Sequence, residues 1–274
     1  MASIRCEPLA PSVLGNQMLG TIIGDIVGSP YEFHNYRKKG FDPFFHKDAR
    51  FTDDTVCTIA VADAILNEIH PEDSLFKWCR LYAENGGWGK QFALWFMADQ
   101  RAPYNSWGNG AAMRISPVGF LANSEDQVIE WSDVVSGVTH NHPEAMASAQ
   151  AVALSVFWAR KKVPADEIRS RISGRFDYDL DTPIETIRAS YVRTERAKDS
   201  VPQAINCALQ ASSFEDAIRS AVSIGGDSDT IAAIAGGIAE AMFGLPEEIA
   251  GAVWKYLPED MRGVVNDFYS AKTP

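Results

Sequence analysis

The sequence is poor in cysteine and has no long apolar runs. Its four cysteines, Cys6, Cys57, Cys79 and Cys207, lie far apart and form no C-x-x-C pair, which excludes a disulfide framework. Cys57 and Cys207 stand in apolar, helix-like contexts, so we expect them to be buried. No run of about 18 uninterrupted apolar residues predicts a membrane span. Because no apolar segment follows Arg5 near the N-terminus, no secretory signal is predicted and we expect a cytoplasmic protein.

Basic charge is also scarce. The 274 residues carry 25 Lys and Arg against 36 Asp and Glu, a formal net charge of −11. Affinity for nucleic acid depends largely on Lys and Arg that neutralise phosphates, so an unmodified nucleic acid is not an expected partner. An anionic membrane surface is excluded for the same reason. Apolar residues at 46% and charged residues at 22% are ordinary values and predict a folded, globular chain.

Strand-like alternation is almost absent, whereas apolar residues recur at helical spacing along nearly the whole chain. The sequence therefore predicts an all-α protein. Prolines tend to fall between the periodic segments, where helices begin or break, and Pro202 is expected to begin a helix. The expected helices cover about 16–28, 54–69, 73–84, 90–98, 144–161, 202–211, 214–223, 229–243, 246–256 and 259–270.

No linker, low-complexity tract or repeat of fixed period divides the chain. The least apolar stretch, at about 173–201, carries charges of both signs and is interpreted as a surface excursion. We therefore expect a single domain over residues 1–274, and a monomer.

Glycine is concentrated in two of the expected helices. Gly20, Gly24 and Gly28 recur every four residues and so share one helix face. In the second helix, nearly every residue of 231–239 is small or β-branched. A glycine inside a helix costs about 0.5–1 kcal/mol relative to alanine, so this many need a reason. Close helix–helix approach is that reason, and it would also bring together the polar residues at the helix ends.

Acidic residues cluster at two helix starts, in Thr52-Asp53-Asp54-Thr55 and in Gly225-Gly226-Asp227-Ser228-Asp229-Thr230. Helix capping explains one aspartate at each start, because carboxylates favour the positive end of the helix dipole. A second aspartate at each start exceeds that need, since like charges oppose each other's ionisation unless a cation intervenes. Such oxygen clusters suit Mg²⁺, Mn²⁺ or Ca²⁺, although the spacing is not that of a calcium loop. From the residues alone, capping and metal binding both remain open.

Two further segments are candidates for ligand binding. The run Ser106-Trp107-Gly108-Asn109-Gly110 contains turn-forming pairs and leads toward Met113-Arg114. Such a loop can present backbone N–H groups to an anion, although it matches neither standard nucleotide-binding motif and a plain surface turn is the alternative. His140, in Thr139-His140-Asn141-His142, stands at a helix start and could be either a structural hydrogen-bonding residue or part of a site.

Taken together and in order, these motifs resemble the ADP-ribosylglycohydrolase family, which includes the dinitrogenase-reductase-activating glycohydrolases. The resemblance covers about residues 17–245. It rests on Gly20-Thr21-Ile22-Ile23-Gly24-Asp25 through Glu32, Thr52-Asp53-Asp54-Thr55, Gly108-Asn109-Gly110 to Met113-Arg114, Thr139-His140, and Gly225-Gly226-Asp227-Ser228-Asp229-Thr230.

The resemblance implies a compact, single-domain helical bundle with two divalent cations, Mg²⁺ or Mn²⁺, in a cleft. The metal ligands it implies are Thr52, Asp53, Asp54, Asp227, Asp229 and Thr230. It gives Glu32 and Asp54 catalytic roles, and it assigns ADP-ribose binding to Ser106, Trp107, Gly108, Asn109 and His140. Gly87, Trp88 and Gly89 match a second loop at the cleft, and Asp99 is a candidate, by position alone, for an additional catalytic aspartate.

The implied function is a metal-dependent hydrolase that cleaves the glycosidic bond between ADP-ribose and a modified protein or small molecule, and that releases ADP-ribose. In chemical terms, two metals can orient the ribose hydroxyls, and carboxylates can stabilise an oxocarbenium-like state. The acceptor stays open among arginine, serine, a nucleobase and an ADP-ribose ester. Two alternatives are kept: a non-catalytic ADP-ribose-binding or structural family member, and a metal-dependent nucleotide phosphohydrolase.

Overall fold

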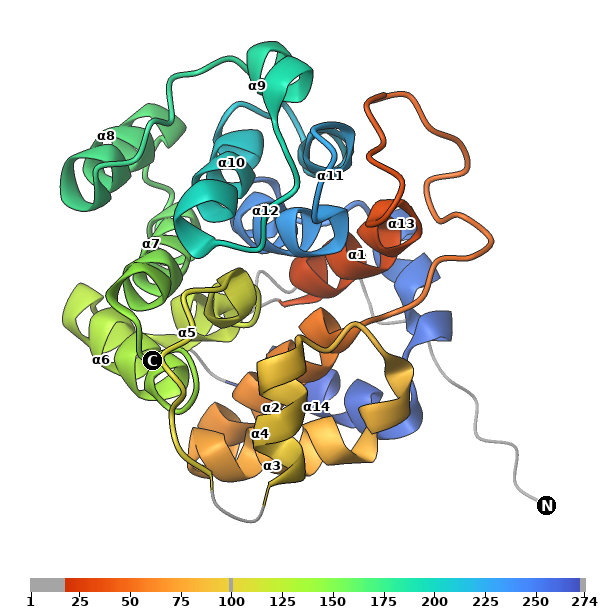
Figure 1. Cartoon of the computed structure of the whole chain (residues 1–274). Helices are drawn as coiled ribbons and strands as arrows, with labels where there is room; N and C mark the ends of the chain where they lie inside the picture. The colour runs from red at the N-terminus through yellow and green to blue at the C-terminus, as the bar shows by residue number, and fades with distance from the viewer. Residues whose placement is uncertain (1–17, 99–100, 272–274) are drawn as a thin grey trace.

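The computed structural model describes residues 18–98 and 101–271, and the regular elements in these ranges are all helices, joined by loops (Figure 1). The prediction of an all-α fold is confirmed. The α-helices are α1 (Leu19–Gly28), α2 (Asp53–Leu66), α3 (Pro71–Leu81), α4 (Lys90–Met97), α5 (Ser116–Leu121), α6 (Glu125–Gly137), α7 (Pro143–Arg160), α8 (Ala165–Phe176), α9 (Ile184–Ser190), α10 (Ala197–Leu209), α11 (Phe214–Ser223), α12 (Ser228–Phe243), α13 (Glu247–Val253) and α14 (Glu259–Ser270).

Four helices lie outside the expected ranges, namely α5, α6, α8 and α9. In α8 the buried face consists of Ile168 and Ile172, one turn apart, and so thin a stripe among charged residues gives little periodic signal. The stretch 173–201, expected as a surface excursion, contains the end of α8, all of α9 and the start of α10.

Pro202 was expected to begin a helix, and this is wrong. It lies inside α10, which begins at Ala197. A proline inside a helix removes one backbone hydrogen bond. Burial of the apolar face of α10, which packs on α7, α11 and α12, compensates for that loss because Val201, Ala204 and Ile205 are completely buried there.

Helices α1 and α12 form the most extensive helix pair and run antiparallel. A Cβ atom added to Gly20 would lie 2.4 Å from the carbonyl oxygen of Gly236, and one added to Gly24 would lie 2.0 Å from that of Ala232. At Gly28 the corresponding distance is 2.4 Å, to the oxygen of Ser228. Each four-residue step along α1 thus meets a four-residue step along α12, as the glycine pattern predicted. The two backbones touch where side chains would keep them apart.

This contact determines which helix ends meet. Because the helices are antiparallel, the last turn of α1 lies beside the first turn of α12 (Figure 1). The chain then continues from Gly28 through a short 3-10 helix, Ser29–Tyr31, to Glu32. Glu32 therefore lies next to the aspartates that begin α12, although about 200 residues separate them in the sequence.

The rest of the core covers this pair. Helix α12 packs on α11, α10 and α7, while α2 packs on α3, α14, α1 and α5. Cys57, Cys79 and Cys207 are buried free thiols, which confirms the expectation for Cys57 and Cys207. In the part of the chain that the structure describes, no helix has both the length and the apolarity that a bilayer crossing requires.

Glu240 is a buried acid within the α1–α12 contact. Its Oε2 accepts a 2.7 Å hydrogen bond from the backbone N–H of Gly20, and burial raises its pKa from 4.5 to about 8. Between these values the folded chain holds a proton that the unfolded chain has released. Glu240 therefore lowers the free energy of unfolding as pH rises through this window, by about 1.4 kcal/mol per pH unit.

We expect the Glu240→Gln variant to lose this component of the pH dependence, since the amide keeps an acceptor oxygen for Gly20 but does not titrate. Urea denaturation of both proteins at several pH values between 5 and 8, at one fixed Mg²⁺ concentration, measures the difference in slope. Parallel profiles for the two proteins would show that Glu240 does not change its protonation on folding.

Candidate active site

A cavity of about 890 Å³ opens where the first turns of α2 and α12 face the loops at 87–89 and 104–110. It gathers almost every residue that the sequence assigned to a site. Those on its wall are Glu32, Asp53, Asp54, Ser106, Trp107, Gly108, Asn109, His140, Asp227, Asp229 and Thr230, with Gly87, Trp88 and Gly89 beside them. Thr52 is not on the wall, and Asp99 lies outside the described residues.

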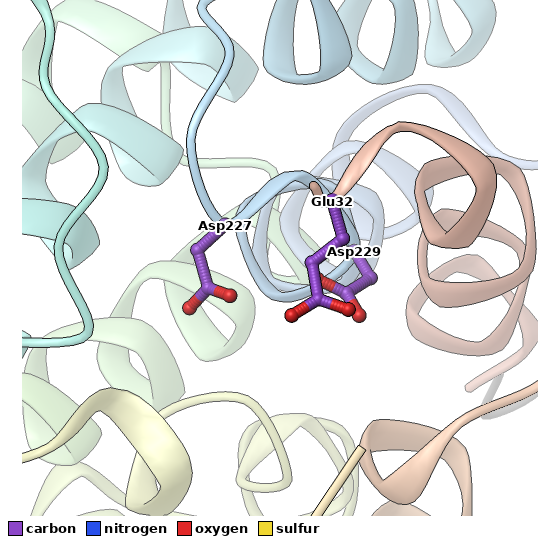
Figure 2. Close-up of side chains that lie close together, drawn as sticks. All are labelled: Glu32, Asp227 and Asp229. Carbon is purple, nitrogen blue, oxygen red and sulfur yellow. The ribbon is translucent and has the colours of Figure 1, made fainter. Parts of the chain in front are cut away.

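Three carboxylates converge at the start of α12. One oxygen each from Glu32, Asp227 and Asp229 lies within 4.8 Å of the others (Figure 2). Asp227 directly precedes α12 without a side-chain capping hydrogen bond, and Asp229 lies in the first turn of α12, whereas Glu32 reaches the group from the turn after α1. Figure 2 shows all three carboxylates pointing the same way, with those of Glu32 and Asp229 adjacent and that of Asp227 to one side.

A second pair of acids comes from the first turn of α2. Asp53 and Asp54 are both buried, and Oδ2 of Asp54 has no hydrogen-bond partner in the described residues. The hydroxyl of Thr230 on α12 donates to the other oxygen of Asp54 over 3.3 Å, which joins the two acidic helix starts. A buried carboxylate oxygen without a partner is costly unless a cation or a donor meets it.

Asp25 holds the start of α2 in place. This fully buried carboxylate accepts hydrogen bonds from the backbone N–H of Thr52 at 2.8 Å, from the hydroxyl of Thr52 at 2.6 Å, from the backbone N–H of Thr55 at 3.1 Å and from the Thr55 hydroxyl. The Thr52 hydroxyl thus donates to Asp25 and caps α2, and one of its lone pairs remains free. Sequence reasoning missed this role, although an aspartate among the glycines of an apolar helix was a visible signal.

Crowding and burial oppose ionisation of these acids. Burial, and then repulsion from the neighbouring carboxylates, raises the pKa values of Asp53, Asp54 and Asp229 well above the aspartate range. Burial raises the pKa of Asp227 to about 6, and burial together with the charge of Asp227 raises that of Glu32. Such a cluster is stable as five carboxylates only if positive charge compensates them.

Hydrogen bonds hold the glycine-rich loop, residues 106–110, next to the acidic cluster. Its backbone pairs with the segment before α10, since Asn109 N–H donates to the carbonyl of Glu195 at 2.9 Å and Ala197 N–H donates to that of Trp107 at 3.0 Å. The Asn109 side chain donates to Asp227 Oδ2 at 2.7 Å. The loop therefore keeps a fixed position relative to α12, with half of the Trp107 side chain exposed at the cavity.

Arg193 is a site residue that sequence reasoning missed. Its guanidinium lies 2.8 Å from Glu32, 3.6 Å from Asp227 and 3.7 Å from Glu195, and it stands over the ring of Phe33 with 4.9 Å to the ring centroid. The ring of Phe33 is 71% exposed at the cavity wall. No local signal marks Arg193, because it lies in the polar stretch expected to be a surface excursion.

Arg37 joins three loops near the cavity. Its guanidinium donates to the carbonyls of Arg188 at 2.5 Å, Ile224 at 2.7 Å and Tyr191, and to the side chain of Asn35 at 3.1 Å. These contacts connect the loop after Glu32, the segment after α9 and the turn before α12. Arg37 thus links the backbone segments that contain Arg193 and the three converging carboxylates, Glu32, Asp227 and Asp229; these three are called the triad below.

The donor set of the site fits divalent cations. All the converging groups are carboxylate or hydroxyl oxygens, which Mg²⁺ and Mn²⁺ prefer, and the described wall has no thiolate. The 4.8 Å grouping of three oxygens and the unpartnered oxygen of Asp54 are the observations that support this fit.

Comparison with known proteins agrees with this fold. The profile of the ADP-ribosylglycohydrolase family matches residues 14–273, so the chain belongs to the ADP-ribosylglycohydrolase family. Membership supports hydrolysis of ADP-ribose linkages as the activity. Among solved structures, a chain titled "ADP-ribosylglycohydrolase-related protein complex" has a TM-score of 0.70, is 20% identical, and is matched over 93% of this chain and 96% of that chain; this likeness shows the fold.

Three relatives are similar to this chain over most of its length, at low sequence identity. The ADP-ribosylarginine hydrolase Tri1 of Pseudomonas putida is 25% identical over 86% of this chain and 73% of its own. The human ADP-ribosylhydrolase ARH3 is 25% identical over 84% of this chain and 85% of its own. An uncharacterized protein of Archaeoglobus fulgidus is 27% identical over 85% and 88%, respectively.

Proposed function

We propose that the chain is a divalent-cation-dependent hydrolase that releases ADP-ribose from a modified arginine side chain. The observation that carries the proposal is that four carboxylates from two helix starts, together with that of Glu32, line one cavity large enough for a nucleotide-sized ligand. The family match over 14–273 supports one catalytic domain.

The residues that would hold two cations, Mg²⁺ or Mn²⁺, come from the two acidic helix starts. They are Thr52, Asp53, Asp54, Asp227, Asp229 and Thr230, with Glu32 completing the group around α12. Thr52 would ligate through the lone pair that its bonds to Asp25 and the α2 backbone leave free. When bound, the cations would supply positive charge that orients the ribose hydroxyls and makes a water molecule more acidic.

The chain's own carboxylates supply the remaining chemistry. Glu32 is the only triad member that is partly exposed, so we propose that it accepts a proton from the attacking water. Asp54 is more deeply buried, and its negative charge would stabilise the positive charge that develops on the ribose carbon as the acceptor leaves. Ser106, Gly108, Asn109 and His140 would hold the diphosphate and ribose.

The adenine end would lie against Trp107, whose ring is half exposed on the same wall. An indole ring can stack on a base while its N–H remains free for a polar partner. We therefore place the two ends of ADP-ribose along the cavity, with the ribose at the acids and the base at the glycine-rich loop.

Arginine is the acceptor that the geometry supports best. The cavity wall carries acidic and aromatic groups that bind a guanidinium, because that of Arg193 lies near Glu32, Asp227 and Glu195 and over the ring of Phe33. The Pseudomonas putida relative is named as an ADP-ribosylarginine hydrolase, which is the same substrate class. A serine acceptor offers no cation to such a surface.

Mass spectrometry of the products tests this function. With arginine-linked and serine-linked ADP-ribosyl peptides as substrates, we expect intact ADP-ribose in the presence of Mg²⁺ or Mn²⁺, faster from the arginine linkage, and none in excess EDTA. AMP instead of ADP-ribose would identify a nucleotide phosphohydrolase. An increase in melting temperature with ADP-ribose but no turnover would identify a non-catalytic binding protein.

A further inference from the structure

A buried chain of side chains runs from Arg114 to His140 behind the glycine-rich loop. Arg114 is fully buried, and its Nη2 donates to the hydroxyl oxygen of Thr139 at 2.7 Å and to the carbonyl of Val135 at 3.3 Å. The Thr139 hydroxyl lies 2.8 Å from Nδ1 of His140. The proposed function gives Arg114 and Thr139 no role, yet their hydrogen bonds lead to His140, which lines the cavity.

The chemistry of the three groups fixes the direction of the hydrogen bonds. A guanidinium has only donors, so the Thr139 oxygen accepts from Arg114. In the described residues the Thr139 hydroxyl has no other acceptor for its proton than His140, so the proton points along this short contact and Nδ1 accepts it. In a neutral imidazole one nitrogen donates and the other accepts, so an accepting Nδ1 leaves the ring proton on Nε2.

The environment keeps the ring neutral. His140 is 5% exposed, and burial, together with the positive charge of Arg114, lowers its pKa well below the ordinary value of 6.5. Because the ring stays neutral at physiological pH, its single proton has a definite location, and the choice between the two nitrogens matters for binding.

Nε2 faces the cavity. It would lie 2.8 Å from a Cβ atom added to Gly110 and 3.9 Å from one added to Gly108, so the ring lies directly against the glycine-rich loop on the cavity wall. Arg114 adds positive charge behind the ring. Its Nε and Nη1 have no hydrogen-bond partner, and no carboxylate in the described residues forms an ion pair with it. The same place in the cavity thus has an N–H donor and an uncompensated positive charge.

We infer that Arg114 and Thr139 are positioning residues that hold the ring proton of His140 on Nε2, so that this nitrogen donates a hydrogen bond to an anionic oxygen of the ligand. The diphosphate of ADP-ribose is the matching chemistry, and in this respect the inference rests on the proposed function. Thr139 does not line the cavity and acts through His140, whereas Arg114 lines the cavity and acts on His140 through the Thr139 hydroxyl.

Thr139→Val tests the inference, because valine has the shape of threonine but has no proton to donate. Imidazole nitrogen NMR of isotope-labelled protein, with His140 signals identified by their loss in His140→Gln, is expected to show an unprotonated, hydrogen-bonded Nδ1 and a protonated Nε2. In Thr139→Val the hydrogen-bonded shift of Nδ1 should disappear, and ADP-ribose should bind about tenfold more weakly, as expected for a lost hydrogen bond to a charged group. Thr139→Ser should restore both properties.

Thr21→Val is the matched control. It removes another buried hydroxyl, which donates to Ser116 at 2.8 Å away from the cavity, and it should leave the His140 signals and ADP-ribose binding unchanged. A proton on Nδ1 in the natural protein, or unchanged signals and affinity in Thr139→Val, would overturn the inference. If the natural protein binds no ADP-ribose, the proposed function fails, while the NMR signals still decide the proton's location.

Discussion

Replacing Asp229 by alanine is expected to abolish cation binding and hydrolysis together while the helical content stays intact. The substitution removes one of the three carboxylates whose oxygens lie within 4.8 Å of one another. Loss of even an outer partner of a metal site costs about 10–100-fold in affinity, so loss of this direct ligand should cost at least about 100-fold. Because the proposed reaction depends on the cations, kcat/KM should fall by about 10³-fold or more.

The stability of the same variant separates a ligand from a structural residue. In EDTA, Asp229→Ala should melt no earlier than the natural protein, since it removes one charge from a crowded cluster in which repulsion and burial oppose ionisation. Addition of Mg²⁺ should then raise the melting temperature of the natural protein but not that of the variant. Calorimetric titration with Mn²⁺ measures the cation affinity of each protein, and circular dichroism measures its helical content and melting temperature.

Asp166→Ala provides the control, because it also removes an acid from the first turn of a helix, α8, but at an exposed position paired with Arg169. Its Mn²⁺ affinity and activity should match those of the natural protein. Unchanged hydrolysis in Asp229→Ala would refute the proposed cation site.

The second large effect is expected from Gly24→Ala. An added methyl group would lie 2.0 Å from the carbonyl oxygen of Ala232 and 2.6 Å from the backbone nitrogen of Ala233, and backbone atoms inside a helix cannot move aside as a side chain can. Overpacking of a core costs about 1–3 kcal/mol where side chains can adjust, so here the free energy of unfolding should fall by about 3 kcal/mol or more.

Gly263→Ala is the matched control for the helix propensity of alanine. Gly263 lies in the exposed part of α14, with no atom within 4 Å of its added Cβ, so this variant should gain about 0.5–1 kcal/mol. Urea denaturation of both variants gives the comparison. Equal and small changes for the two would mean that α1 and α12 separate easily, and that their close contact is not what holds the site together.

The parts of this architecture that could be predicted from the sequence are those with a local signal. The four-residue glycine step of α1 and the small residues of α12 predicted their contact because only small residues allow such an approach. Two aspartates at each of two helix starts predicted a cation site, and the structure brings Asp54 and Thr230 from these two starts into contact. In both cases the signal lies within one turn or one helix face.

Other features could not be predicted because they depend on partners far away in the sequence. The hydroxyl of Thr52 is directed to Asp25, and Arg193 reaches Glu32 across 161 positions. Likewise, the proton location on His140 depends on Arg114, 26 residues earlier by the numbering, through the Thr139 hydroxyl. A charged residue in a polar loop gives no sign of which carboxylate it will meet.

The contact between α1 and α12 also sets the alignment of the proposed cation site. Glycine recurs at each four-residue step, and four residues of an α-helix rise about 6 Å. A slip of the pair by one step would carry Glu32 about 6 Å relative to Asp229, more than the 4.8 Å that spans the ligand oxygens. Correct alignment therefore depends on backbone contacts between the two helices, which reach the backbone of Asp229 at Gly28. A chain that kept all five carboxylates but lost these glycines would have every ligand and still fail to assemble them around an ion.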